Sequence, residues 1–276
     1  MLFLVSFIMY MEETKKHRNE IDIIDFLTNY ISKEIIFIPN PGNAGDSLIS
    51  MGTLQLLDKI GLNYTMGDIN KQYSNKILFY GGGGNLVGLY KNCYNFINKN
   101  RNTNEIVILP HTIKNVDSFL SLCDENIKII CREYISYDYV YSKIKQKNNV
   151  FLSKDMAFYI DGLESYKNIQ GVGECNCFRI DCEKTNIKIP SNNTDISETL
   201  RKKNNTSDPH VINSVSLSMF NYLSKFKIIN TNRLHVAIAG SLLGKHVNLY
   251  QNNYYKIKAV YDYSIKDNFE NTYLCD

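Results

Sequence analysis

Short runs of apolar residues recur along the first half of the chain, and segments with helical periodicity lie between them. Each run has the length and the content of Ile, Val and Phe that are typical of a buried strand in a parallel sheet. Strand, helix and strand in repetition predict a doubly wound α/β layer. The predicted strands are residues 34–38, 76–80, 105–109, 126–131 and 149–152, and amphipathic helices are expected over residues 20–31 and 47–60.

The second half repeats this pattern on a smaller scale after a polar interruption. Residues 183–210 are rich in Asn and Lys and hold few large apolar side chains, which predicts a flexible loop. We therefore expect two Rossmann-like domains, the first of residues 1–155 and a smaller C-terminal α/β domain of residues 156–276. The expected strand, helix and strand of the second domain are residues 225–230, 234–243 and 246–250.

Composition limits the class of protein. A chain of 276 residues with 44% apolar content can bury a sizeable core. Its 31 basic and 28 acidic side chains give a net charge of +3, which is too small for nucleic acid to be the main partner, so any basic site is local. The seven Cys residues, an odd number, do not form the paired framework of a small secreted domain, and we expect a reducing, cytoplasmic location.

Residues 1–10 form an apolar run at the start of the chain. No basic residues precede the run, no small-residue cleavage site follows it, and it falls short of the roughly 20 residues needed to span a bilayer. We interpret it as a packing or extension segment in preference to a membrane or targeting signal. Peripheral contact with a membrane remains the alternative.

Glycine-containing turns follow the first two predicted strands. The first turn, residues 39–47, contains Asn43 and Asp46 and leads into a helix whose free N–H groups favour an anion. The alternative is that Asp46 or Ser47 only caps this helix and that the glycines only turn the chain. The turn is no P-loop, because Gly-Lys-Ser/Thr does not follow. In the second turn four glycines precede Asn85, and we interpret them as a turn or a ligand contact, with a flexible loop as the alternative; they are Gly81, Gly82, Gly83 and Gly84.

Polar residues also end the third and fourth predicted strands. His111 and Thr112 follow the third strand, and Arg132 and Glu133 follow the fourth. The four motifs therefore share the carboxyl edge of consecutive strands, which is the edge where open α/β sheets bind ligands. Taken alone, Arg132 would equally fit a structural ion pair.

The sharpest signal is the segment Arg233-Leu234-His235, which lies between a predicted strand and a predicted helix. Arginine offers a planar fork to a carboxylate or phosphate, and the start of a helix adds partial positive charge. Histidine can give or take a proton near neutral pH. Taken alone, Arg233 would more often be a solvated charge, and His235 a helix residue whose hydrogen bonds are satisfied within the protein. The functional interpretation therefore depends on their combination with the glycine turns.

Three cysteines, Cys175, Cys177 and Cys182, lie close together beside Glu174 and Asp181. Their spacing does not match a zinc site, because no second Cys-x-x-Cys and no nearby His accompanies them. We interpret them as buried small apolar side chains or exposed thiols.

Taken in order, these stretches resemble the polysaccharide pyruvyl transferase family. The resemblance extends over about four fifths of the chain, although the family often has Gln-Ser where His111-Thr112 stands and Asp where Asn232 stands. The matching stretches are residues 42–46, 81–85, 109–112, Arg132-Glu133, residues 155–157, 179–183 and 231–235, and Tyr254-Tyr255-Lys256.

The resemblance implies a GT-B-like arrangement of two domains and transfer of a pyruvyl group from phosphoenolpyruvate to two sugar hydroxyls, which forms a ketal in polysaccharide biosynthesis. It also implies that no cofactor is required and that the acceptor is a glycan or a lipid-linked saccharide. Arg132 and Arg233 would hold the donor, and His235 would transfer protons. The expected substrate-binding residues are Asn43, Asp46, Gly82, Gly83, Gly84, Asn85, His111, Thr112, Asp155, Leu234, Tyr254 and Lys256.

Two other functions fit the same features. A GT-B-like glycosyltransferase could use the loops to hold the diphosphate of a nucleotide sugar. A protein of the same fold could instead bind glycans without turnover. The acceptor sugar and the oligomeric state are left open by the sequence.

Overall fold

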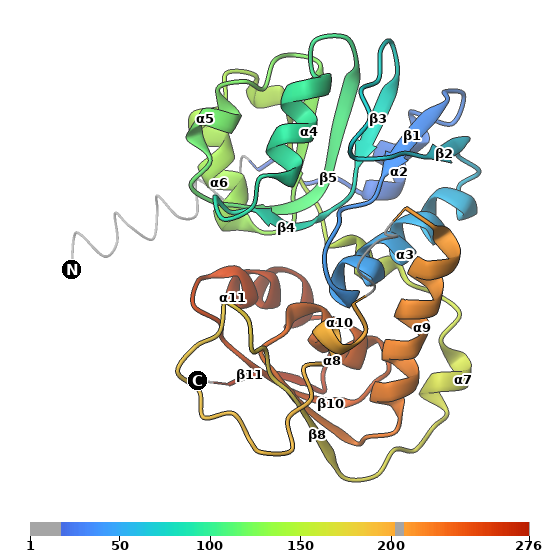
Figure 1. Cartoon of the computed structure of the whole chain (residues 1–276), viewed down its shortest axis with the longest axis vertical. Helices are drawn as coiled ribbons and strands as arrows, with labels where there is room; N and C mark the ends of the chain where they lie inside the picture. Colours follow the sequence, from blue (N-terminus) through green and yellow to red (C-terminus); the bar gives the residue numbers. More distant parts are fainter. Residues whose placement is uncertain (1–17, 202–206, 276) are drawn as a thin grey trace, which may run out of the picture.

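The computed structural model describes residues 18–201 and 207–275, and the apolar run at residues 1–10 lies outside these residues. The chain has a mixed α/β fold with two parallel sheets, as predicted (Figure 1). No helix within the described ranges has both the length and the apolar content needed to cross a membrane.

The larger sheet contains seven strands within the described residues, in the order β2-β1-β3-β5-β6-β7, and β4 also pairs with β5. Their side chains alternate between two buried faces, because successive residues of a strand point to opposite sides of the sheet. In β1, Ile35 and Phe37 face one core cluster, whereas Ile36 and Ile38 face the other. The strands are β1 (Ile35–Ile38), β2 (Tyr64–Met66), β3 (Ile77–Tyr80), β4 (Gly83–Leu86), β5 (Glu105–Ile113), β6 (Ile127–Cys131) and β7 (Val150–Leu152).

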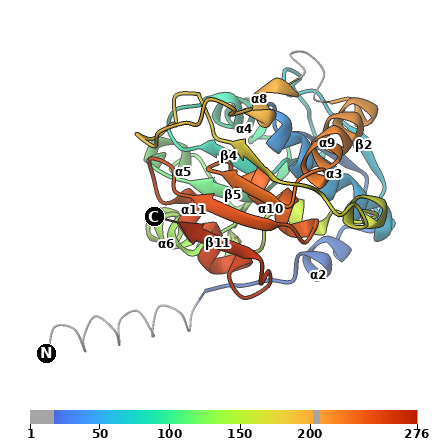
Figure 2. The same ribbon diagram turned by 90° about the horizontal axis from the view of Figure 1, so that it is seen from below.

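Helices cover both faces of this sheet (Figures 1 and 2). One face packs against apolar side chains of α4 (Asn92–Asn100), α5 (Asp117–Leu120) and α6 (Tyr134–Lys143), such as Phe96 and Val140. The other face packs against α2 (Ile23–Thr28) and α3 (Ala44–Lys59). The predicted helix at residues 47–60 is therefore confirmed as α3, and the one at residues 20–31 is confirmed in part as α2.

Two details of the sheet differ from the prediction. The third strand does not end at Leu109 but continues to Ile113, so His111 and Thr112 lie inside β5 and are fully buried. The second half of β5 finds a new partner in β4, which includes two of the glycines expected in a turn. Gly82, which directly precedes β4, is closely packed against β5, because a Cβ at this position would lie 2.8 Å from the carbonyl oxygen of Pro110.

The smaller sheet contains four strands within the described residues, in the order β11-β10-β9-β8, and neighbouring strands are again parallel. Strands β9 and β10 and helix α10 confirm the predicted C-terminal βαβ unit, whereas β8, β11 and α9 were not predicted. The elements are β8 (Glu174–Cys177), β9 (Ile228–Thr231), β10 (His246–Tyr250), β11 (Thr272–Cys275), α7 (Glu164–Lys167), α8 (Ile196–Thr199), α9 (Pro209–Ser224), α10 (Leu234–Leu242), α11 (Lys256–Val260) and the π-helical turn η3 (Tyr261–Ile265).

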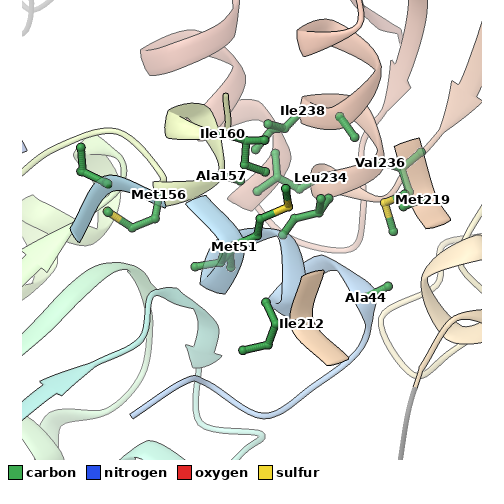
Figure 3. Close-up of a cluster of buried hydrophobic side chains, with 14 of the residues drawn as sticks. Ala44, Met51, Met156, Ala157, Ile160, Ile212, Met219, Leu234, Val236 and Ile238 are labelled. Atoms are coloured by element: carbon green, nitrogen blue, oxygen red, sulfur yellow. The ribbon is translucent and has the colours of Figure 1, made fainter. Parts of the chain in front are cut away.

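One hydrophobic cluster joins the two sheets. It runs from β1 through α3 to α9, α10 and β10, and it includes the 3-10 turn η2 (Met156–Tyr159). Figure 3 shows Met51 of α3 beside Met156, Ala157 and Leu234 in this cluster. Packing is so close that a Cβ on Gly52 would lie 2.1 Å from the carbonyl oxygen of Met156.

A second 3-10 turn, η1 (Lys147–Asn149), precedes β7. The division into two domains near residue 155 and the GT-B-like arrangement stay predictions.

The polar segment at residues 183–210 has more structure than expected. Its described part contains α8 and the first residues of α9, and Asn193 forms an isolated bridge with Asn176 of β8. Burial of carboxylates beside arginines, which composition does not reveal, orders this part of the chain. Asp195 is 5% exposed and pairs with Arg233.

Candidate functional site

A pocket of about 330 Å³ lies where the carboxyl ends of strands from both sheets meet the start of α3 and of α10. Strand β4 and the residue after β6 contribute from the larger sheet, and the segments after β8 and β9 contribute from the smaller one. Among the side chains that line the pocket, five are Arg or Lys and four are Asp or Glu. The pocket is therefore a polar site in which cations and carboxylates are closely interleaved.

The first glycine turn forms one wall of the pocket at the N-terminus of α3. Asn43 is the N-cap, and its side chain accepts a hydrogen bond from the N–H of Gly45 at 2.9 Å. Asp46 completes the capping box by accepting from the N–H of Asn43 at 2.9 Å. Burial raises the pKa of Asp46, and the nearby charges of His235, Arg132 and Lys256 act against that rise. The N-cap is therefore Asn43, whereas Asp46 takes part in capping from position N3, and both residues also line the pocket.

Arg132, which follows β6, is 1% exposed yet reaches the pocket. Its Nε donates to Thr112 Oγ1 at 2.8 Å, and its Nη1 donates to Asp155 Oδ2 at 2.6 Å. These two bonds fix the plane of the guanidinium. Its Nη2 has no hydrogen-bond partner within residues 18–201 and 207–275, and it lies beside Gly84. One donor edge of a buried arginine is therefore directed at the pocket.

Lys256, the first residue of α11, is the second cation beside Gly84. Its Nζ donates to Glu183 Oε2 at 2.7 Å and lies 4.9 Å from the ring centroid of Tyr254. Burial lowers the pKa of Lys256 to about 8, although the Glu183 carboxylate favours the charged form. The lysine is therefore mostly charged at neutral pH, and it loses this charge as the pH rises through about 8.

Gly84 leaves free space between these two cations. A Cβ at this position would lie 3.0 Å from Nη2 of Arg132 and 3.9 Å from Nζ of Lys256. The space that a side chain would fill is thus within reach of both positive groups. An anionic oxygen there would receive charge-assisted hydrogen bonds from both sides.

Arg233 occupies the N-cap position of α10, as its predicted place between strand and helix requires. Its guanidinium makes a bidentate pair with Asp195, from Nε to Oδ1 at 3.0 Å and from Nη2 to Oδ2 at 2.5 Å. Nη1 also contacts Asp181 at 2.9 Å, and Nη2 lies 3.7 Å from Glu198. The expected anion-binding arginine therefore faces carboxylates that attach residues 181–198 to the start of α10.

Arg179 extends this ion-pair network toward the lysine. It donates to both oxygens of Asp181, at 2.8 and 3.1 Å, and to Glu183 at 2.7 Å. Glu183 is shared by Arg179 and Lys256, and their charges outweigh burial and lower the pKa of its carboxyl. Tyr90, from the segment after β4, donates to the other oxygen of Glu183 at 3.2 Å.

His235 is the second residue of α10, and its ring packs over Gly45 of α3. A Cβ on Gly45 would lie 2.8 Å from Nδ1 of His235, so only glycine leaves space for this ring. Nε2 of His235 lies 3.2 Å from Asp155 Oδ2. The side chain is 15% exposed and lines the pocket. A titratable imidazole is thus placed in the same pocket as the two cations beside Gly84.

A buried row of polar groups lies behind the pocket. Asn40 accepts from Tyr80 at 3.0 Å and from Asn85 at 2.5 Å, and it donates to Asp46 at 3.2 Å. Nε2 of His111 lies 2.9 Å from the side-chain oxygen of Asn85. Burial lowers the pKa of His111 to about 3, so this histidine is neutral and supports Asn85 from inside the sheet.

The structure brings most of the expected site residues together. Those that line the pocket are Asn43, Asp46, Gly84, Asn85, Arg132, Arg233, Leu234, His235 and Lys256. Those that do not line it lie behind the first layer of side chains or in the loop before α11; they are Gly82, Gly83, His111, Thr112, Asp155 and Tyr254.

Other pocket residues were not expected from the sequence. Arg179, Asp181 and Glu183 belong to a stretch that carried the family resemblance, and this was the available signal for them. Cys182 lies in the same stretch, and Pro41 lies in the first glycine turn. The remaining ones lie in segments without a motif; they are Tyr90, Asn92, Ser197, Glu198 and Arg201.

The cysteines of β8 are buried, and Cys177 Sγ lies 3.8 Å from Cys175 Sγ. Cys182 is exposed and lines the pocket. Within the part of the chain that the structure describes, no group of three or more His, Cys, Asp and Glu side chains is placed to hold a metal ion.

Comparison with known proteins adds independent information. The sequence model of the polysaccharide pyruvyl transferase family matches residues 43–254, which include the pocket segments from Asn43 to His235. A crystal structure of a functionally uncharacterized protein from Klebsiella pneumoniae is similar to the chain, with a TM-score of 0.82 and 36% sequence identity. The match covers 92% of this chain and 97% of that one. No curated protein matches the sequence.

Proposed function

The chain belongs to the polysaccharide pyruvyl transferase family, and we propose that it transfers the pyruvyl group of phosphoenolpyruvate to a sugar of a glycan or glycan precursor. The observation that carries this proposal is the pocket in which Arg132, Lys256 and His235 converge beside Gly84. We also infer that the two parallel sheets correspond to the two halves of a GT-B-like arrangement, since the pocket lies between their strand ends.

The donor binds in this proposal with an anionic group in the space above Gly84. Nη2 of Arg132 and Nζ of Lys256 then contact the same anion, and the N-terminus of α3 adds its partial positive charge. Arg233 adds positive potential to the pocket, although its guanidinium is paired with Asp181 and Asp195. These pairs also keep residues 181–198 in place. Fixed cations of this kind stabilise the charge that develops on a departing phosphate.

The reaction forms two C–O bonds and breaks one. C3 of the enol takes up a proton, a sugar hydroxyl adds to C2, and the C2–O bond to phosphate breaks with the electron pair leaving on phosphate. A second hydroxyl then adds to C2 and completes the ketal. Of the two protons lost by the hydroxyls, one balances the proton at C3 and the other leaves with phosphate. His235 is the residue in the pocket that we assign to these transfers.

The acceptor binds on the side of the pocket formed by the segments after β4 and β8. Tyr90 offers a half-exposed ring, and Asn92, Asp181 and Glu198 offer polar groups that can bind sugar hydroxyls. The glycan or lipid-linked nature of the acceptor is our inference from the family.

The proposal is tested by incubating the purified protein with phosphoenolpyruvate and a panel of β-galactosides and N-acetylmannosamine glycans. Mass spectrometry should detect a gain equal to pyruvic acid minus water on one acceptor, with release of inorganic phosphate. The variants Arg132→Met and His235→Gln should remain folded and give no product. Failure to modify any acceptor, together with no binding of phosphoenolpyruvate and tight binding of a nucleoside diphosphate, would instead favour a nucleotide-sugar glycosyltransferase.

A further inference from the structure

We infer that Asp155 is a positioning residue that fixes the protonation of the His235 ring, so that Nε2 carries the proton and Nδ1 is the nitrogen available for proton transfer. The inference rests on the proposed function only for the role of His235 in the reaction. The predicted tautomer itself is argued from the contacts of the Asp155 carboxylate, which is buried and does not line the pocket.

Asp155 is fully buried at the junction between the two sheets. One oxygen, Oδ1, accepts from the N–H of Ala157 at 2.8 Å and caps the turn η2. The other, Oδ2, lies 2.6 Å from Nη1 of Arg132 and 3.2 Å from Nε2 of His235. Both oxygens are therefore occupied by protein groups, and neither is placed to bind a substrate directly.

The chemistry of these partners decides which nitrogen of His235 carries the proton. An ionised carboxylate only accepts hydrogen bonds, so the nitrogen that faces it must donate. Burial alone would raise the pKa of Asp155, but its contacts with His235 and Arg132 outweigh burial and keep the carboxyl ionised. In the neutral ring the proton therefore sits on Nε2, and Nδ1 keeps its lone pair.

Nδ1 lies on the side of the ring that packs against Gly45, and both residues line the pocket. It has no hydrogen-bond partner among the residues that the structure describes. The charged groups that act on the ring are Asp155 from the start of η2 and Asp46 from α3. Arg132 shares Oδ2 of Asp155 with the ring. Of these, only Asp155 is within hydrogen-bond distance of the imidazole.

The same carboxylate therefore aligns two parts of the site. It fixes the guanidinium plane of Arg132, which directs Nη2 toward Gly84, and it orients the ring of His235. A carboxylate that sets the tautomer of a histidine supports proton transfer without contacting the substrate. Loss of the charge with retention of shape should change the chemical step more than the binding of the donor.

The decisive measurement is nitrogen NMR of the protein labelled with ¹⁵N-histidine, at a pH where the His235 ring carries one proton. The chain has five His residues, and the resonances of His235 are identified by their loss in His235→Gln. The wild-type ring should show a protonated Nε2 and an unprotonated Nδ1. In Asp155→Ala the ring loses the acceptor that faces Nε2, so the proton should no longer be confined to Nε2 and the Nδ1-protonated form should appear. A wild-type ring with the proton on Nδ1, or no change in Asp155→Ala, would overturn the inference.

The matched control is Glu105→Gln, which removes a half-buried carboxylate paired with Lys128 in the larger sheet and does not contact His235. It should leave the ring signals of His235 unchanged. If an acceptor is found, Asp155→Asn should lower kcat by about 100-fold or more, with a smaller change in the KM for the donor. The NMR result stands whether or not pyruvyl transfer is detected, so failure of the proposed function and failure of this inference are distinguishable.

Discussion

Arg233 donates two hydrogen bonds to Asp195, at 3.0 Å and 2.5 Å. Arg233 is the N-cap of α10, and Asp195 is the N-cap of α8, 38 residues earlier in the chain. Both side chains are almost fully buried, at 6% and 3% exposure. The pair closes one side of the pocket, because the segment that it holds carries Asp181, Glu183 and Glu198. A change at Asp195 should therefore affect the fold of this segment as well as the site.

The variant Asp195→Ala should lower the free energy of unfolding by about 3 kcal/mol, since removal of one partner leaves a buried guanidinium with fewer carboxylates. Denaturant unfolding followed by fluorescence or circular dichroism measures the effect. The control Glu34→Gln removes the exposed pair with Lys76 and should cost less than about 1 kcal/mol. Equal effects of the two variants would show that the Arg233–Asp195 pair is not a stabilising contact.

Donor binding should weaken as the pH rises through about 8, because burial lowers the pKa of the Lys256 amine to about 8. The protonated lysine attracts an anion below this pH, and the neutral amine loses that attraction above it. Calorimetric titration with phosphoenolpyruvate between about pH 7 and pH 9 measures this change. The pH dependence should disappear in Lys256→Met and persist in Lys258→Met, which changes an exposed residue of the same helix. Persistence in both variants would assign the titration to another group.

The variant Gly84→Ala should fold normally and bind phosphoenolpyruvate at least about tenfold more weakly. The added methyl group would fill the space beside Arg132 Nη2 and Lys256 Nζ that we assign to the donor. Comparison of the dissociation constant and the melting temperature with those of the wild type checks both parts. Unchanged affinity in a folded variant would place the anion elsewhere in the pocket.

Alanine usually stabilises the interior of a helix relative to glycine by about 1 kcal/mol. At position 52 the opposite is expected, because the new Cβ would lie 2.1 Å from the carbonyl oxygen of Met156 and would force α3 away from η2. Gly52→Ala should therefore lower the free energy of unfolding by about 1–3 kcal/mol, while Lys59→Ala at the exposed end of α3 changes it little. A stabilised Gly52→Ala variant would contradict the close packing between the two sheets.

The sequence predicts those parts of the site that depend on strand ends. Parallel strands bring their carboxyl ends to one edge, so Arg132 and the two glycine turns could be placed together from the order of apolar runs alone. Arg233 could be placed at a helix start because an apolar helix follows a short apolar strand.

Other features depend on contacts that have no local pattern. Asp195 lies in a polar segment typical of a loop, and long-range contacts such as its pair with the buried guanidinium of Arg233 give that segment a fixed shape. The glycines of β4 predict a turn because glycine has low strand propensity, which tertiary pairing with β5 overrides. The position of His111 inside β5 follows from the same pairing and could not be read from the apolar run that ends at Leu109.

The most direct test of the site is a crystal structure of the protein with phosphoenolpyruvate. The account predicts an anionic oxygen of the donor within hydrogen-bond distance of Nη2 of Arg132 and Nζ of Lys256, with its C2–C3 unit facing the ring of His235. A donor bound away from Gly84, with Arg132 and Lys256 making only their present contacts to Asp155 and Glu183, would contradict it.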